Sequence, residues 1–144
     1  MSVGQPAVDE PIVLRVVGRI RSDLDAADAA PRQGDEGAPD AWLILEAEYA
    51  DALAGVVAGD SLVVLTWLHQ ARRDVLEIQP RGDPDAAWTG VFRTRSPHRP
   101  NPVGIHPVRV HAVEGRRLRI GPIEAIDGTP VVDIKVELGP LGER

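Results

Sequence analysis

The segment Val132-Asp133-Ile134-Lys135-Val136-Glu137-Leu138 carries the pattern that decides the fold. Apolar and charged side chains alternate along it, so one side of the segment is apolar and the other is charged. A period of two residues is that of a β-strand with one buried side and one solvent-facing side. The segment is therefore predicted to be a half-buried strand of an antiparallel sheet or barrel.

Further short strands are expected along the rest of the chain, in a set of about eight. They are predicted at residues 14–20, 42–48, 61–68, 75–79, 91–94, 108–112 and 117–120. The segments 42–48 and 61–68 are more continuously apolar and are expected to lie deeper. At most one short helix is expected, between Tyr49 and Val57, because Gly55 and Gly59 limit its length. Short strands in a chain with 14 glycines and 13 prolines indicate an all-β barrel or sandwich.

The length of 144 residues and the mass of 15.5 kDa fit one domain. Residues 1–10 are expected to form a flexible N-terminal tail and residues 11–140 a single barrel domain, with no additional C-terminal domain. Residues 23–40 are rich in Ala, Asp, Gly and Pro and are long for a loop inside a compact domain. Loops of this length are usually either disordered or functional.

The composition excludes several classes of protein. The chain has no cysteine, which rules out disulfide scaffolds, thiolate zinc sites and a cysteine nucleophile. Its four histidines (69, 98, 106 and 111) lack metal-binding spacing, so no metal site is expected. Glycine-rich nucleotide loops and a serine nucleophile elbow are also absent. No signal-like pattern or membrane-length apolar run is present, so we expect a cytoplasmic protein without membrane contact.

The net charge of −6 hides an uneven distribution along the sequence. Residues 22–60 contain ten acids and one base, and residues 91–119 contain seven arginines and one acid. Such a chain can bind an anion on one surface while it stays acidic overall. The alternative is that the two regions neutralise each other within the fold or across a dimer.

The segment Gly90–Ile105 (GVFRTRSPHRPNPVGI) carries the chemistry. Its prolines at 97, 100 and 102 exclude a helix and stiffen the backbone. A stiff loop holds Arg95, Arg99 and Asn101 in place before a ligand binds, which lowers the entropic cost of binding. The alternative is a stiff connection whose arginines only face solvent. Two short elements, Pro31-Arg32-Gln33 and the turn Asp127-Gly128-Thr129-Pro130, are weak signals when each is taken alone.

Together these segments resemble the TrmO/TsaA-like family. Its characterised members are S-adenosylmethionine-dependent methyltransferases that act on threonylcarbamoyl-adenosine in the tRNA anticodon loop. The resemblance covers residues 13–138 and rests on five elements in order. They are PRQ (31–33), EYAD (48–51), WLHQ (67–70), GVFRTRSPHRPNPVGIH (90–106) and DGTPVVDIKV (127–136).

The resemblance implies a small β-barrel and a homodimer that binds S-adenosyl-L-methionine near the subunit interface. The implied cofactor contacts are Pro31, Arg32, Gln33, His69, Gln70, Arg95, Ile105, Asp127, Gly128, Thr129 and Pro130. Contacts with the substrate are assigned to Arg93, Arg99, Asn101 and Lys135.

The chemistry of the cofactor fits these residue types. S-adenosylmethionine carries a carboxylate, an ammonium, a sulfonium and an adenine, so its pocket needs both signs of charge. We assign Arg95 or Arg32 to an anionic group, and polar groups around His69 and Asp127 to the ammonium, the sulfonium or the adenine edge. Methyl transfer needs no metal, and positioning contributes several kcal/mol, up to ~7–11 in ideal cases. His69 or Asp127 is the candidate proton acceptor, unless both are structural.

The chain departs from the family pattern at three positions. His106 stands where serine is usual, His98 where an aromatic residue is usual, and Val136 where proline is usual. We expect these changes to alter the substrate pocket and to leave the cofactor site intact. The leading hypothesis is a tRNA methyltransferase. The alternatives are a methyltransferase with a small-molecule or other non-tRNA substrate, and a binding module that retains the cofactor without catalysis.

Overall fold

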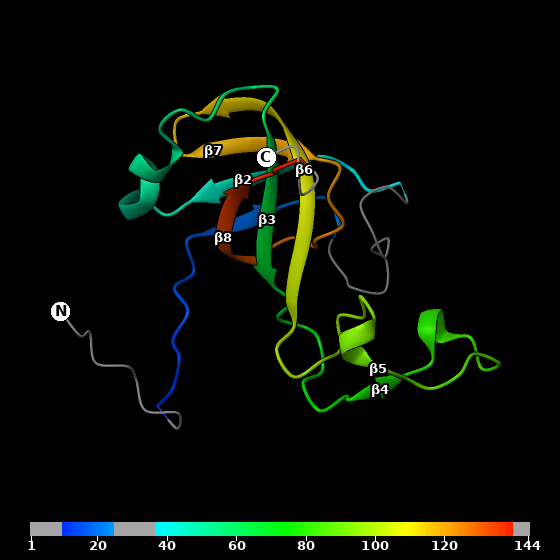
Figure 1. Cartoon of the computed structure of the whole chain (residues 1–144). Coiled ribbons are helices and arrows are strands. Elements are labelled where there is room, and N and C mark those ends of the chain that lie inside the picture. Colours follow the sequence, from blue (N-terminus) through cyan, green and yellow to red (C-terminus); the bar gives the residue numbers. More distant parts are fainter. Residues whose placement is uncertain (1–9, 25–36, 140–144) are drawn as a thin grey trace.

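A computed structural model of the chain describes residues 10–24 and 37–139. Six antiparallel strands close into a barrel in the order β1-β2-β7-β6-β3-β8 (Figure 1). Their bounds are Gly18–Arg21 (β1), Ala41–Leu45 (β2), Ser61–Trp67 (β3), Val103–Glu114 (β6), Arg117–Gly121 (β7) and Pro130–Val136 (β8). The all-β single-domain barrel predicted from the sequence is therefore confirmed.

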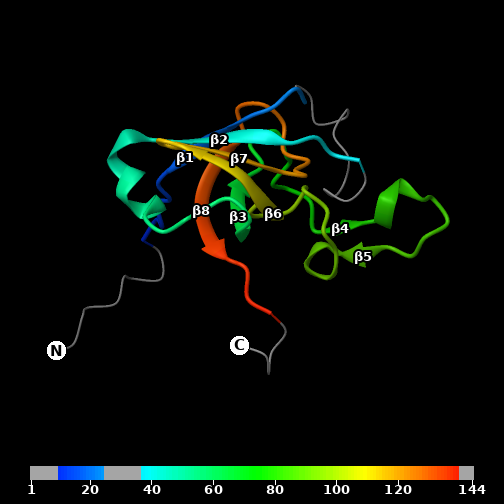
Figure 2. The same ribbon diagram turned by 90° about the horizontal axis from the view of Figure 1, so that it is seen from above.

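The two remaining strands form a separate small sheet. Glu77–Ile78 (β4) pairs with Thr89–Gly90 (β5), and Figure 2 shows this pair beside the barrel. Short 3₁₀ helices connect the elements: Ala47–Leu53 (η3), Pro80–Gly82 (η4) and Val91–Arg93 (η5). In the described residues, six of the eight expected strands correspond to barrel strands, and the strand expected at 75–79 corresponds to β4 in the small sheet.

Three expected elements differ in the structure. The strand predicted at 91–94 is wrong, because the N–H of Thr94 donates to the carbonyl of Val91 and closes a 3₁₀ turn. The short helix predicted at 49–57 is instead the 3₁₀ helix η3, which ends before Gly55 with its φ of 90°. The strand expected from residue 14 begins only at Gly18, because the chain pairs with β2 and β8 from that residue onward.

Inward-facing apolar side chains from every barrel strand fill the interior. Alternation is clearest in β6, where exposed and buried residues follow each other over the first nine positions. Burial of one such side chain stabilises the fold by ~1.5–3 kcal/mol, so packing rather than the ladder decides the register. The fully buried apolar residues of the barrel strands include Ile20, Leu43, Val64, Leu118, Ile120 and Val131.

A small polar network interrupts this apolar interior. Thr66 Oγ1 lies 2.7 Å from His106 Nε2, and His106 Nδ1 lies 2.7 Å from Glu124 Oε1. Thr66 and His106 are buried, and the side chain of Glu124 is 18% exposed. The carboxylate accepts a hydrogen bond from Nδ1–H, so in a neutral ring Nε2 accepts from the threonine hydroxyl. The network links β3, β6 and the loop after β7.

Gly104 lies directly against this network. A Cβ at residue 104 would clash with Thr66 Oγ1 and would lie 2.7 Å from His106 Nε2, closer than real side-chain contacts allow. Glycine is required here because two inward-facing polar side chains occupy the space that a methyl group would need. Gly90 in β5, by contrast, has open space around the same position.

We predict that Gly104→Ala lowers the free energy of unfolding by ~1–3 kcal/mol, because it over-packs the barrel interior. The matched control Gly90→Ala is expected to change it by less than ~1 kcal/mol. Urea unfolding followed by circular dichroism measures both values. Equal stability of the two variants would contradict the close packing at Gly104.

Candidate functional site

The alternating direction of the strands brings the predicted site segments to one end of the barrel. β1, β7 and β3 finish at this end, and β2, β6 and β8 begin there. The turn at residues 127–130 leads into β8, residues 69–70 follow β3, and residues 94–102 lead into β6. Strand pairing also brings these segments together. Near the end of β3, Trp67 pairs with Val103 at the start of β6, and Thr66 pairs with Val131 at the start of β8. Pro31, Arg32 and Gln33 lie outside the described residues.

The proline-rich loop packs against the segment that leaves β3. The N–H of Arg72 donates to His98 Nδ1 at 3.0 Å, and the N–H of Arg99 donates to the carbonyl of Arg72 at 3.0 Å. Leu68 also donates from its N–H to the carbonyl of Pro102 at 2.8 Å. These backbone contacts hold residues 68–72 and 98–102 side by side. His98, where the family has an aromatic residue, thus serves as a hydrogen-bond acceptor between the two segments.

The side chain of Arg99 ties its own loop together. Its guanidinium donates to the carbonyls of Thr94 (3.1 Å), Ser96 (2.9 Å) and Val91 (2.7 Å). These three hydrogen bonds stabilise the loop, in which the prolines have no backbone N–H to donate. Arg99 was expected to contact substrate. The geometry gives it a positioning function instead, and a substrate contact stays a prediction.

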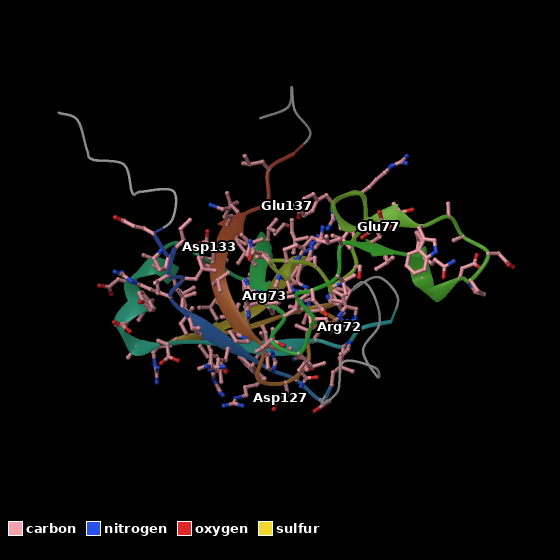
Figure 3. All side chains as sticks on the ribbon, turned by 90° about the horizontal axis from the view of Figure 1, so that it is seen from below. Arg72, Arg73, Glu77, Asp127, Asp133 and Glu137 are labelled. Atoms are coloured by element: carbon pink, nitrogen blue, oxygen red, sulfur yellow. The ribbon has the colours of Figure 1, made fainter. Side chains whose placement is uncertain are left out.

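Arg73 is a site residue that the sequence did not reveal. Its guanidinium donates to the carbonyl of Pro100 at 2.8 Å and to Asn101 Oδ1 at 3.0 Å, and it stacks 5.0 Å from the centre of the Trp67 ring. Arg73 therefore orients Asn101, a predicted substrate residue, from the opposite segment. Figure 3 labels Arg73 and its neighbour Arg72 in this region. No motif signalled Arg73, because its contacts depend on the folded position of residues 100–101.

The neighbouring Arg72 and Asp74 form an ion pair at the surface. Arg72 Nη2 lies 2.9 Å from Asp74 Oδ2, and Arg72 Nε donates to Asp74 Oδ1 at 3.0 Å. This hydrogen-bonded pairing lowers the pKa of Asp74 and raises the pKa of Arg72. Both side chains are about two-thirds exposed, so water screens the attraction and the pair contributes little to stability.

The turn Asp127–Pro130 is fixed by contacts with β1 and the residues after it. Asp127 Oδ1 accepts a hydrogen bond from the N–H of Ser22 at 3.0 Å, and Asp127 Oδ2 lies 3.8 Å from Arg21. Gly128 has a φ of 83°, and its N–H donates to the carbonyl of Ile20 at 2.8 Å. Thr129 is buried, and its hydroxyl donates to the carbonyl of Ile126 at 2.7 Å. The turn is thus rigid before any ligand binds.

The remaining predicted residues are available to a ligand. His69, Gln70, Arg93 and Arg95 are exposed and make no hydrogen bond or ion pair with any residue that the structure describes. Ile105 faces outward from β6 and is 44% exposed. Lys135 differs, since its ammonium lies 3.2 Å from Asp133 on the outer face of β8. The cofactor and substrate assignments themselves stay predictions.

These groups meet the chemical needs of S-adenosylmethionine. Arg95 offers a carboxylate a guanidinium that has no partner among the described residues, and the Asp127 carboxylate stands at the same end of the barrel. Residues 10–24 and 37–139 contain no group of three or more His, Cys, Asp or Glu side chains that could hold a metal ion. Over the same residues, no helix is long and apolar enough to cross a membrane.

The fold and these segments define the barrel type found in a class of S-adenosylmethionine-dependent methyltransferases. The sequence model of the tRNA-methyltransferase O (TrmO) N-terminal domain matches residues 19–138. The chain belongs to this family, as the motifs predicted.

Relatives of nearly the same length support this assignment. An S-adenosyl-L-methionine-binding protein of Archaeoglobus fulgidus is 38% identical over 124 residues, covering 86% of this chain and 88% of the relative. A probable S-adenosyl-L-methionine-binding protein of Methanothermobacter thermautotrophicus is 41% identical over 127 residues, with 88% and 90% covered.

Solved structures of TrmO share the fold. The crystal structure of TrmO from Pseudomonas aeruginosa superposes with a TM-score of 0.71 at 33% identity. The alignment covers 90% of this chain and 57% of the solved chain. This chain therefore spans just over half the length of that protein.

We predict that Arg99→Ala loosens the proline-rich loop, because three carbonyls lose their shared donor. Hydrogen–deuterium exchange at residues 94–101 is expected to rise by roughly tenfold or more, as the loop opens more easily. The matched variant Arg93→Ala removes a neighbouring arginine whose side chain makes no hydrogen bond or ion pair with the described residues, and it should leave this exchange unchanged. Similar exchange in both variants would show that Arg99 does not hold the loop.

Proposed function

We propose that the chain transfers the methyl group of S-adenosylmethionine to the exocyclic nitrogen of threonylcarbamoyl-adenosine in the tRNA anticodon loop. The observation that carries this proposal is the convergence of three of the family's motif segments (67–70, 90–106 and 127–136) at one end of the barrel, with a loop that Arg99 holds in place. A rigid site favours methyl transfer, since the reaction is a displacement that depends on alignment.

The chain's own residues divide the work in this proposal. Arg95 binds the carboxylate of the cofactor as a forked donor. Asp127 positions a cationic or donor group of the ligand. Its carboxylate can do so because the N–H of Ser22 and the guanidinium of Arg21 fix its orientation. His69 is exposed and makes no hydrogen bond to any described residue, which makes it the better candidate to take the proton from the attacking nitrogen. The cofactor supplies the methyl group.

Binding of the cofactor and methylation of tRNA can be tested separately. Calorimetry is expected to detect S-adenosylmethionine binding by the wild type, and Arg95→Ala should weaken it by roughly tenfold or more, the cost of a lost charged hydrogen bond. Arg93→Ala is the matched control and should bind normally. Nucleoside mass spectrometry of tRNA incubated with enzyme and cofactor should then reveal the methylated threonylcarbamoyl nucleoside.

Each failure has its own meaning. Absence of cofactor binding by the wild type would refute the methyltransferase assignment. Cofactor binding with methylation of a small molecule, and none of tRNA, would refute the substrate assignment. Cofactor binding with no turnover of any acceptor would favour a binding module.

We also propose that a second copy of the chain covers the outer face of β3 and β6. The apolar side chains Val63, Leu65, Trp67, Val103, Ile105 and Pro107 point outward there as three cross-strand pairs. Val103 and Ile105 are 41% and 44% exposed, although one side of a soluble sheet is usually polar. A homodimer through this face would place Ile105, an expected cofactor contact, at the subunit interface.

Sedimentation should show a dimer for the wild type and a monomer for Leu65→Arg, because burial of a charge in an apolar interface is costly. Val113→Arg places the same charge on the distant end of β6 and should stay dimeric. A monomeric wild type, or a dimeric Leu65→Arg variant, would contradict the proposed interface.

A further inference from the structure

A second outer face of the barrel, formed by β1, β2 and β7, is rich in arginine. The outward positions of these strands are Arg19 and Arg21 in β1, Trp42 and Ile44 in β2, and Arg117 and Arg119 in β7. We name these six residues the arginine face. None of the six is acidic, in a chain with a net charge of −6.

The register arranges the arginine face in two rows. Arg21, Trp42 and Arg119 are consecutive cross-strand partners, and Arg19 and Arg117 flank Ile44 in the next row. Standard strand spacing separates the arginines of one row by about 10 Å, and the two rows by about 7 Å. Four cations therefore frame a central strip of one aromatic and one aliphatic side chain.

Each acid near the arginine face stands at its rim. Asp127 lies 3.8 Å from Arg21, Asp40 lies 3.5 Å from Arg119, and Glu114 lies 2.9 Å from Arg117. These side chains are between 37% and 58% exposed, so the pairs are weak and leave the arginines free to exchange partners. Arg19 has no carboxylate partner in residues 10–24 and 37–139, and it donates to the carbonyl of Gly128.

Trp42 adds an aromatic ring to the arginine face, which suits a ligand that carries aromatic bases as well as anionic groups. The guanidinium of Arg117 lies 4.5 Å from the centre of its ring. Trp42 also lines a depression of about 420 Å³, together with Arg21 and Arg119 and with the carboxylates of Asp23, Asp40 and Asp127 at its rim. This arrangement suits nucleic acid, since a base can stack on the guanidinium plane that the Trp42 ring supports and phosphates can pair with the other cations.

The arginine face is continuous with the candidate cofactor site. Asp127 belongs both to the depression beside Trp42 and to the turn that precedes β8. An RNA strand on the arginine face that passes Asp127 would therefore reach the end of the barrel where the motif segments meet. The five motif segments do not contain Arg19, Arg21, Arg117 or Arg119, so the family resemblance assigns these arginines no role.

We propose that the arginine face binds the sugar–phosphate backbone of the tRNA beside the nucleotide that is modified. This inference rests on the proposed function and adds the surface that holds the substrate. Because the arginines gather on one face, the acidic net charge does not prevent local binding of RNA.

The test uses the double variant Arg117→Ala/Arg119→Ala, since neither arginine contacts an expected cofactor residue. Fluorescence anisotropy with tRNA carrying threonylcarbamoyl-adenosine measures affinity at several salt concentrations. The variant should bind roughly tenfold or more weakly at low salt, and the slope of log affinity against log salt should fall by about two. Calorimetry should give unchanged affinity for S-adenosylmethionine.

Two controls separate charge from structure. Arg117→Lys/Arg119→Lys keeps both charges and should recover most of the affinity and the salt slope. Arg15→Ala removes one exposed arginine ahead of β1, outside the arginine face, and should bind tRNA like the wild type.

The outcomes are distinct. If the wild type methylates tRNA and the double alanine variant binds it equally well, the inference is wrong and the proposed function stands. If the wild type binds cofactor but no tRNA, both the inference about the arginine face and the proposed function are wrong. Loss of tRNA affinity and salt slope with intact cofactor binding supports the arginine face as the tRNA surface.

Discussion

Closure of the antiparallel barrel is the constraint on which the rest of the structure depends. A closed ladder leaves no free edge, and each strand must run opposite to its two neighbours. Residues that follow β3 and residues that precede β6 and β8 therefore meet at one end, although they lie far apart in the sequence. Closure adds the pairing of β1 with β8, which brings the turn at 127–130 against Ser22 and Arg21.

The rigidity of this end has two sources. Above the barrel, the prolines and the three bonds from Arg99 hold the loop, and Arg73 orients Asn101 from the neighbouring segment. Inside it, the network through His106 joins β3, β6 and the loop after β7, with Gly104 leaving room for it. Both arrangements are made by the chain's own residues, so little ordering entropy has to be lost on binding. That suits a reaction governed by alignment.

Much of this was predictable from the sequence, for a physical reason. Alternation in residues 117–120 reports burial on one side of a strand, and the motif segments were recognisable from their order. In residues 132–138 burial follows the alternation only in part, because Val136 and Leu138 are 64% and 55% exposed. The 3₁₀ turn at 91–93 was not predictable, because a turn bond from Thr94 replaces the ladder there. Arg73, Glu124 and the arginine face were missed as well. Their contacts join segments that are distant in the sequence and become neighbours only when the strands pair.

The central claim is that one end of the barrel binds the cofactor. Hydrogen–deuterium exchange of the chain with and without S-adenosylmethionine tests it most directly, because protection maps to segments. The account predicts slower exchange at residues 66–70, 94–105 and 127–130, all at the end where β3 finishes. Protection confined to the opposite end, at η3 and the turn between β6 and β7, would contradict it.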